Sequence, residues 1–371
     1  MWPVIVYLNN ATTAYPREQV AVAAYNEALN TAPADVRHAA GDSDADVARA
    51  RIAELLGVAA GEVALLSDGT LAINYVIQGT ARGGRILADN RSHNAVLRTA
   101  NAVGRLTVVD LYSLEDEPQE FLDPGFVPDL ICLTHTSNVN GAVLGVEQAL
   151  AGFRERFPGC PILVDASQAA GAADMGGALA ADYVVFPGHK HLGAVPGAAV
   201  LVARRALRPL VFGGTGAGAE DAVWSGDGNV VEVGTPNAPA ALALAAALAR
   251  AQEEQEADRK RIAELVALLH AGLAEMRSLR PIGPPPDGAR TGVVGCAVTV
   301  GHPELDWART LGLQGVIVRG GLMCSPVHHG QLGLPLGTLR FSVSRHNSAE
   351  QVERAVAVVA ELDRALTDLY T

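Results

Sequence analysis

Short apolar segments alternate with helix-like segments through the first two thirds of the chain, and this alternation constrains the fold most. Apolar runs typical of buried strands lie at 62–66, 85–89, 106–111, 129–134, 161–167, 182–187 and 198–203. Helical patterns occupy 17–29, 44–56, 70–80, 93–103 and 146–156. Such alternation is typical of an α/β domain with a mostly parallel sheet. Sheets of this kind bind ligands beyond the carboxyl ends of their strands.

The last third follows a different pattern and predicts a second, smaller domain. A long helical pattern at 239–273 precedes RPIGPPPDGARTG, a segment typical of a linker or exposed turn. Strand-like runs follow near 292–300, 315–320 and 337–344. The capping-box sequence SAEQ then begins a final helix. We predict a large domain at 17–250, and a small α+β domain formed by 1–16 and 251–371.

Composition argues against several classes of protein. The formal charge of −12 disfavours a nucleic-acid partner, which usually requires a basic face. The longest apolar run, at 238–249, is shorter than the roughly 20 residues that a membrane span requires. The chain's first residues lack the basic region of a signal peptide. Four cysteines without a C-x-x-C pair fit a reducing compartment. We expect a cytoplasmic protein with no membrane, nucleic-acid or metal partner.

Lys190 is the most unusual of the polar residues that follow the predicted strands. The chain contains only two lysines, and Lys190 comes shortly after the apolar run 182–187. Desolvation favours the neutral amine of a lysine beside apolar structure, and that amine can form a Schiff base with an aldehyde. Arginine cannot do so. The alternative is an ordinary strand-end lysine whose amine reaches solvent.

Other predicted strand ends carry groups that suit pyridoxal phosphate. A helix N-terminus could hold its phosphate, although an ordinary strand–helix turn has the same pattern. An imidazole could stack on the ring, a carboxylate could keep the pyridine nitrogen protonated, and an amide could bond the phenolic oxygen. The candidate residues are Gly69, Thr70, His93, Asn138, Asp165 and Gln168. Together with Lys190 they predict a pyridoxal-phosphate site.

Cys324 differs in its surroundings from the other three cysteines. Cys132, Cys160 and Cys296 lie in or beside strand-like runs, where cysteine usually behaves as a small hydrophobe. Cys324 lies in the glycine-rich segment RGGLMCSP, and loops carry function more often than cores do. Cys324 is therefore the candidate nucleophile, with an unreactive loop residue as the alternative.

With these motifs the chain resembles class V aminotransferases of pyridoxal-phosphate fold type I. Within that family it resembles the cysteine desulfurase and selenocysteine lyase branch. The resemblance runs nearly end to end. It rests on YLNNATTAYP, SDGTLAIN, SHNAVLR, HTSNVNG, VDASQAAG, PGHKHLG, EVGTPNAP, VRGGLMCSP and GTLRFSVSRHN. It implies a large domain with a mixed, mostly parallel seven-stranded sheet and a small α+β domain.

The resemblance also implies how the cofactor is held. Lys190 would form the Schiff base, with His189 beside it and His93 stacked on the ring. Asp165 would face the pyridine nitrogen. Thr235 would reach the phosphate bound by a partner subunit, which implies a homodimer with composite sites.

For the substrate, the resemblance implies recognition of cysteine or a close relative. Arg340 would bind the carboxylate with its guanidinium fork, although a surface ion pair is an alternative for this residue. Asn10 would also bind substrate. Cys324 would take the sulfur as a persulfide and leave L-alanine, with a protein as a possible later acceptor.

The chain departs from the family pattern at positions that bear on the reaction. Pro187 replaces the serine or threonine that commonly gives the phosphate a hydroxyl. Met323 replaces the histidine before the cysteine, and Leu71 replaces a glutamate. Rival reactions therefore stay open: a C–S lyase, a selenocysteine lyase, an epimerase or an aminotransferase. A non-catalytic sulfur-delivery scaffold is a further alternative.

Overall fold

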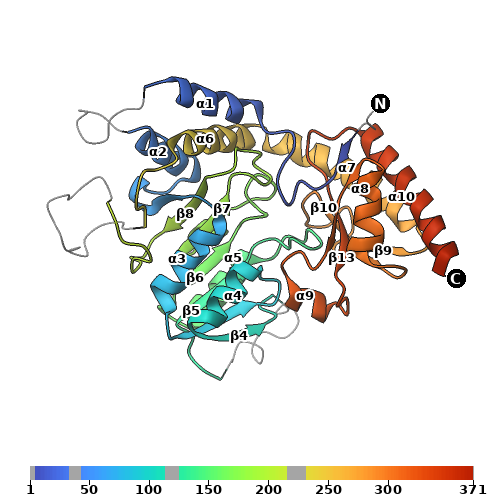
Figure 1. Cartoon of the computed structure of the whole chain (residues 1–371). Coiled ribbons are helices and arrows are strands. Elements are labelled where there is room, and N and C mark those ends of the chain that lie inside the picture. The colour runs from blue at the N-terminus through green and yellow to red at the C-terminus, as the bar shows by residue number, and fades with distance from the viewer. Residues whose placement is uncertain (1–4, 33–42, 113–124, 215–230, 371) are drawn as a thin grey trace. The chain divides into compact units, whose positions relative to one another are not determined.

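The computed structural model describes residues 5–32, 43–112, 125–214 and 231–370, which divide into two compact units (Figure 1). Unit 1 takes its described residues from 1–16, 136–144 and 254–371, and unit 2 from 17–135 and 145–253. Sequence analysis placed 136–144 in the large domain, whereas the structure groups it with unit 1. The cause is backbone pairing: Thr291 N–H donates to the Gly141 carbonyl at 2.9 Å, and Val143 N–H donates to Ala289 at 3.0 Å.

Unit 2 is built on a seven-stranded sheet of order β2-β8-β7-β6-β5-β3-β4. Its strands are β2 (Val63–Leu66), β3 (Arg85–Asp89), β4 (Arg105–Val109), β5 (Leu130–Thr134), β6 (Ile162–Asp165), β7 (Tyr183–Pro187) and β8 (Ala199–Ala203). All neighbours from β7 to β4 pair in parallel, whereas β8 is antiparallel to both β7 and β2. The predicted α/β fold with a mixed, mostly parallel sheet is confirmed.

Helices follow or precede most of these strands. They are α1 (Gln19–Asn30), α2 (Asp44–Leu56), α3 (Gly69–Ala81), α4 (Asn94–Val103), α5 (Val146–Arg156) and α6 (Ala238–Glu253), with the short 3-10 turns η1 (Ala60–Glu62) and η3 (Ala178–Ala180). The alanine-rich α6 lies against α1 and α2 (Figure 1). Small side chains permit such close helix contacts. No helix within the described ranges has the length and apolar character needed to cross a bilayer.

The long helical pattern at 239–273 forms two helices rather than one. The first is α6, and the second is α7 (Gln255–Ala274). Glu254 separates them with a non-helical backbone, φ −105° and ψ 15°. The break falls where alanine-rich sequence gives way to a charged stretch, and it is also where unit 2 ends and unit 1 resumes.

Unit 1 contains an antiparallel sheet of order β12-β13-β10-β9 and a parallel pair, β1 with β11. The strands are β1 (Val6–Tyr7), β9 (Leu279–Ile282), β10 (Val293–Val298), β11 (Val316–Ile317), β12 (Arg319–Gly321) and β13 (Thr338–Ser342). Its remaining helical elements are the π-helical η4 (Pro303–Ala308), α8 (Arg309–Leu313), α9 (Pro326–Gln331) and α10 (Ala349–Tyr370). The proline-rich segment at 280–292, expected as a linker or turn, joins β9 to β10 and supplies part of β9.

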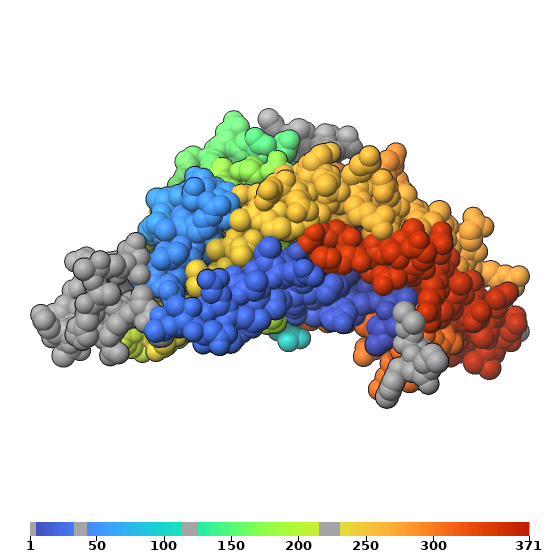
Figure 2. Space-filling model, turned by 90° about the horizontal axis from the view of Figure 1, so that it is seen from above, coloured from blue at the N-terminus to red at the C-terminus, as the bar shows by residue number. Residues whose placement is uncertain are grey.

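Hydrogen bonds within unit 1 hold the start of the last helix and join it to the first strand. The predicted capping box begins α10: Gln351 N–H donates to Ser348 Oγ, and Ser348 N–H donates to Gln351 Oε1, both at 3.2 Å. Asn347 Nδ2, just before this helix, donates to the Tyr7 carbonyl at 3.1 Å. Figure 2 shows the dark-blue N-terminal residues beside the red C-terminal helix.

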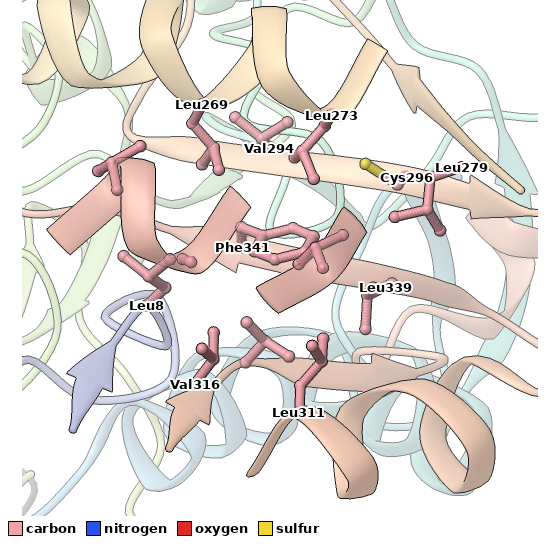
Figure 3. Close-up of a cluster of buried hydrophobic side chains, with 14 of the residues drawn as sticks. Leu8, Leu269, Leu273, Leu279, Val294, Cys296, Leu311, Val316, Leu339 and Phe341 are labelled. Atoms are coloured by element: carbon pink, nitrogen blue, oxygen red, sulfur yellow. The ribbon is translucent and has the colours of Figure 1, made fainter. Parts of the chain in front are cut away.

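The core of unit 1 lies where α7 and α10 meet its sheet (Figure 3). Leucines of α7 and apolar residues of α10 recur at three- and four-residue steps, so each helix presents one apolar face. The strands supply the opposing side chains. The cluster includes Leu265, Leu269, Leu273, Leu279, Val294, Cys296, Leu339, Phe341, Val352, Ala355 and Val359.

Leu269→Ala should therefore destabilise unit 1. Leu269 is fully buried in this cluster, and truncation of a buried leucine typically costs about 2–5 kcal/mol of unfolding free energy. Leu313→Ala is the control, because Leu313 is 84% exposed and should change the unfolding free energy by about 0.5 kcal/mol or less. Urea denaturation measures both. Equal effects of the two substitutions would contradict the assigned core.

Candidate functional site

Strand register brings the carboxyl ends of several strands of unit 2 to one edge of the sheet. Leu66 of β2 and Pro187 of β7 both lie opposite Ala199 of β8. Asp165, the last residue of β6, pairs with Thr134 of β5 and with Val185 of β7. The segments that follow these strands therefore start from the same edge, as in sheets that bind ligands beyond their strand ends.

Asp165 is a buried carboxylate, and only one of its two oxygens accepts a hydrogen bond from the described residues. The residue is 8% exposed, and its Oδ1 accepts a hydrogen bond from the Ser167 backbone N–H at 3.0 Å. Across the described residues, Oδ2 accepts no hydrogen bond and no basic side chain pairs with Asp165. A buried carboxylate is costly without a partner. It fits a cationic N–H donor from a ligand, such as a protonated pyridine nitrogen.

The turn that carries Lys190 is held firmly by its neighbours. Gly193 N–H donates to the Lys190 carbonyl at 2.8 Å, and Arg17 Nη1 donates to the His189 carbonyl at 2.9 Å. On the next residue, the His191 ring Nε2 lies 2.7 Å from Gln168 Oε1. Gln168 thus ties the segment after β6 to the turn after β7. Lys190 itself is partly buried. The hydrogen bonds around it fix the backbone that carries its side chain.

His93 has a ring orientation set by the backbone of α4. It is the N-cap of that helix, and its Nδ1 accepts the Ala95 N–H at 3.0 Å. An Nδ1 that accepts a hydrogen bond carries no proton, so a neutral ring has its proton on Nε2. The cap holds the flat ring in one orientation, as a stacking residue requires.

The N-terminus of α3 lies at the same edge of the sheet. Asp68 is its N-cap, with Oδ1 accepting the Leu71 N–H at 2.9 Å. Gly69 and Thr70 are its first two residues, whose N–H groups face out of the helix end. A helix N-terminus binds phosphate through such groups. Thr235, by contrast, is exposed and lies just before α6.

Unit 1 contains a pair of arginines directly opposite each other. Arg319 of β12 pairs in register with Arg340 of β13. Like charges in that position repel. Thr12 accepts from both guanidinium groups, at 2.8 Å from Arg340 Nη2 and 3.3 Å from Arg319 Nη1. Arg340 Nη1 also donates to the Asn138 carbonyl at 2.8 Å.

Arg340 is a buried cation that lacks a counter-ion within the described residues. The residue is 2% exposed, and its Nε has no hydrogen-bond partner there. Burial, together with the charge of Arg319, lowers the pKa of Arg340 to about 9. Among the described residues, no acidic side chain forms an ion pair with Arg319 or Arg340. The pair therefore suits an anionic ligand such as a carboxylate, and this contradicts a surface ion pair for Arg340.

The loop of Cys324 adopts an unusual backbone conformation that brings its thiol to this pair. Met323 and Cys324 have φ angles of 50° and 59°, in the left-handed region that few non-glycine residues adopt. Asn138 holds the loop: its Nδ2 donates to the Met323 carbonyl at 2.7 Å, and its Oδ1 accepts from Ser325 Oγ at 2.9 Å. Arg319 Nη2 lies 3.8 Å from Cys324 Sγ.

The other three cysteines are poor nucleophiles. All four cysteines are free thiols, but Cys132 and Cys296 are buried in β5 and β10. Burial raises the pKa of Cys132 far above its usual range, and it raises the pKa of Cys160 and Cys296 to about 12. The thiolate is the reactive form of cysteine, so these thiols are unreactive near neutral pH.

Two candidate residues lie in unit 1 with their amides already engaged. Asn138 supports the Cys324 loop, and Asn10 donates through Nδ2 to the Ser342 carbonyl at 2.8 Å and accepts the Tyr15 N–H at 3.1 Å. Their roles as cofactor and substrate ligands stay predictions. His329, five residues after Cys324, bonds the Ser325 carbonyl and Thr338 Oγ1.

Sequence analysis missed three residues that the structure brings to these sites: Thr12, Ser167 and Arg319. Each lies inside a quoted motif but had no assigned role. For Arg319 the available signal was an arginine within the predicted strand near 315–320, five residues before Cys324. For Thr12 and Ser167 there was none, because a hydroxyl is common in any turn.

A family model and several named relatives match this chain over most of its length. The aminotransferase class-V family model matches residues 5–355. A relative from Pseudomonas aeruginosa, named a probable cysteine desulfurase, is 30% identical and covers 98% of this chain and 94% of its own. One from Haloferax volcanii, named cysteine desulfurase, is 26% identical and covers 96% of this chain and 88% of its own.

Solved structures agree at the level of the fold. The apo structure of a cysteine desulfurase from Thermococcus onnurineus has a TM-score of 0.81 with this chain, at 24% identity. The match covers 98% of this chain and 95% of the other. At that identity the similarity is evidence for the fold alone.

His189 should stay neutral in the cofactor-free protein until the pH falls well below its usual range. Burial, together with the charges of Lys190 and Arg17, lowers the pKa of His189 to about 4. Because the folded-state pKa lies below the unfolded one, this group's contribution to stability is lost as pH falls from about 6.5 toward 4. NMR titration, assigned with His189→Gln, measures it. A titration midpoint near 6.5 would contradict the burial.

Proposed function

We propose that this chain, which belongs to the aminotransferase class-V family, is a pyridoxal-phosphate enzyme that removes sulfur from L-cysteine. One observation carries the desulfurase assignment. Cys324 lies beside Arg319, and Arg319 lies opposite the buried Arg340, which lacks a counter-ion among the described residues. A carboxylate site next to a thiol suits an amino acid whose sulfur is to be transferred.

Residues of unit 2 fit the cofactor. Lys190 would bind its aldehyde carbon, Asp165 would accept from its ring nitrogen, and His93 would stack on the ring. The N-terminus of α3 would hold the phosphate. When bound, pyridoxal phosphate supplies an electron sink that makes the bonds of the amino acid's α-carbon labile. The unpaired Oδ2 of Asp165 is the observation that best supports this fit.

Arg340 would orient the amino acid, and Lys190 would move its proton. Arg340 offers its Nε–H and its remaining Nη hydrogens to the carboxylate, and it is already fixed by Thr12 and Asn138. A guanidinium fork binds a carboxylate in two places, which fixes the orientation of the α-carbon. The Lys190 amine then takes the proton from that carbon and returns one later.

Cys324 would take the sulfur. Its thiolate attacks the substrate sulfur, a sulfur–sulfur bond forms, and the bond between that sulfur and the β-carbon breaks. The electron pair of the broken bond remains with the β-carbon, which takes a proton and becomes the methyl group of alanine. Cys324 is left as a persulfide, which a second thiol, such as one on a protein acceptor, can remove.

The proposal extends to assembly and location. The family motif assigns Thr235 to the phosphate of a second subunit, and the exposure of Thr235 is compatible with that role. We therefore propose a cytoplasmic homodimer. Sedimentation of the purified chain tests the dimer directly.

Rival reactions on the same scaffold differ in their need for Cys324. An epimerase or an aminotransferase acts at the α-carbon and needs no thiol, and a C–S lyase can release sulfur without a protein acceptor. A selenocysteine lyase would differ only in the substrate atom. A sulfur-delivery scaffold would need neither Lys190 nor the partly satisfied Asp165. Product analysis with cysteine separates these cases.

Cys324→Ala should slow alanine formation from cysteine at least about 100-fold, because it removes the sulfur acceptor. Cys160→Ala is the matched control. Cys160 is partly exposed, but it belongs neither to the site residues around Lys190 nor to those around Arg340. Alanine is measured by chromatography, and the Cys324 peptide of the parent is examined by mass spectrometry for one added sulfur atom. Equal rates for the parent and Cys324→Ala would overturn the nucleophile assignment.

Arg319 Nη2 lies 3.8 Å from Cys324 Sγ, so its charge would assist the attack of this sulfur on an electrophile and would hold the persulfide that forms. Arg319→Gln should slow iodoacetamide alkylation of Cys324 at pH 7 roughly 3- to 10-fold, because it removes that cation. Arg319→Lys keeps the positive charge, so its alkylation rate should fall less than that of Arg319→Gln. Alkylation is followed by mass spectrometry of the Cys324 peptide. An unchanged rate in Arg319→Gln would contradict the role.

A further inference from the structure

The sheet edge of unit 2 has an unexplained feature at Pro187. Residue 187 is the last of β7 and comes three residues before Lys190. In the proposed family this position commonly supplies a hydroxyl to the cofactor phosphate, and proline has neither a hydroxyl nor an N–H to offer. This inference rests on the proposed function. If the chain binds pyridoxal phosphate, another residue must supply the hydroxyl to its phosphate, or that hydrogen bond is lost.

Ser167 and Pro187 both lie close to the first residue of α3. A Cβ built on Gly69, the first residue of α3, would lie 3.6 Å from Pro187 Cδ and 3.7 Å from Ser167 Oγ. Val185 of β7 lies at 3.8 Å from the same point. The hydroxyl of Ser167 and the ring of Pro187 thus flank the beginning of one helix.

Ser167 is buried, yet its hydroxyl has no partner among the described residues. The residue is 9% exposed, and its backbone N–H donates to Asp165 Oδ1. Its Oγ neither donates nor accepts a hydrogen bond there. Ser167 Oγ is not among the described side-chain atoms that are fully buried without a partner, so the hydroxyl itself remains accessible. It is therefore free to donate to a ligand with acceptor oxygens beside the helix N-terminus.

The helix N-terminus itself is available to an anion. α3 has 13 residues, and the backbone N–H groups of Gly69 and Thr70 have no hydrogen-bond partner within the described residues. The Asp68 carboxylate is occupied, because it accepts from Leu71 N–H and from Ser67 Oγ, both at 2.9 Å. Two N–H groups and one hydroxyl therefore meet at one place, and all three are donors.

We propose that Ser167 donates its hydroxyl to the phosphate of the cofactor, in place of the hydroxyl that Pro187 lacks. Under this proposal the donor missing at the end of β7 is replaced by one that lies two residues after the end of β6. Because the Ser167 N–H binds Asp165, the same short segment would hold the cofactor at both its ring nitrogen and its phosphate.

The test compares two ligands that differ only in the phosphate. Cofactor-free protein is titrated with pyridoxal phosphate and with pyridoxal, and binding is followed by absorbance. Ser167→Ala should weaken pyridoxal phosphate roughly 10- to 100-fold, as expected for a hydrogen bond to a charged group. Pyridoxal affinity should change by about two-fold or less, since the variant removes no contact to the ring.

Two further variants make the test independent of folding. Ser167→Cys keeps the size of the side chain but is a weak donor, so it should show the same selective loss. Pro187→Ser in the Ser167→Ala background restores a hydroxyl at the original position and should recover most of the affinity for pyridoxal phosphate. Thermal unfolding of each variant shows whether it is folded.

The outcomes separate this inference from the proposed function. Equal weakening of both ligands, or no weakening of either, overturns the role of Ser167. If borohydride still traps pyridoxal phosphate on the Lys190 peptide in that case, the proposed cofactor assignment stands. If the parent protein binds neither ligand, both the inference and the proposed function fail.

Discussion

The parallel pairing of β5, β6 and β7 is the constraint on which the arrangement of unit 2 depends. Parallel strands end at the same edge, so whatever follows them in sequence starts from one place. β8 reverses direction between β7 and β2, which keeps β2 parallel to β7 and brings the beginning of α3 to that edge as well. Asp165, Lys190 and Gly69 therefore share an edge although they are far apart in the sequence.

In unit 1 the corresponding constraint is the repulsion between two arginines in register. Arg319 and Arg340 have no counter-ion among the described residues, and the Thr12 hydroxyl accepts a hydrogen bond from each of them. Such an arrangement is stable when an anion completes it. A substrate carboxylate and the thiolate of Cys324 are the two anions that the proposed reaction provides, one for each guanidinium.

The sequence was most informative where a local rule decides the structure. Each of the apolar runs in the first two thirds became a strand of one sheet, because buried parallel strands need continuous apolar sequence. The capping box at Ser348 needs only neighbouring residues and was also predicted. The pattern at 239–273 was misread as one helix, because α6 and α7 meet without a proline or glycine to mark the break at Glu254.

The sequence by itself determined the strand–helix order, the rare lysine and the motifs of the family, since these depend on periodicity and residue type. Only the tertiary structure placed residues 136–144 with unit 1, paired Arg319 with Arg340, and set Ser167 beside Pro187 at the start of α3. The physical reason is that such contacts join residues remote in the chain. They depend on strand register and on the direction of single side chains, and no short-range pattern encodes either.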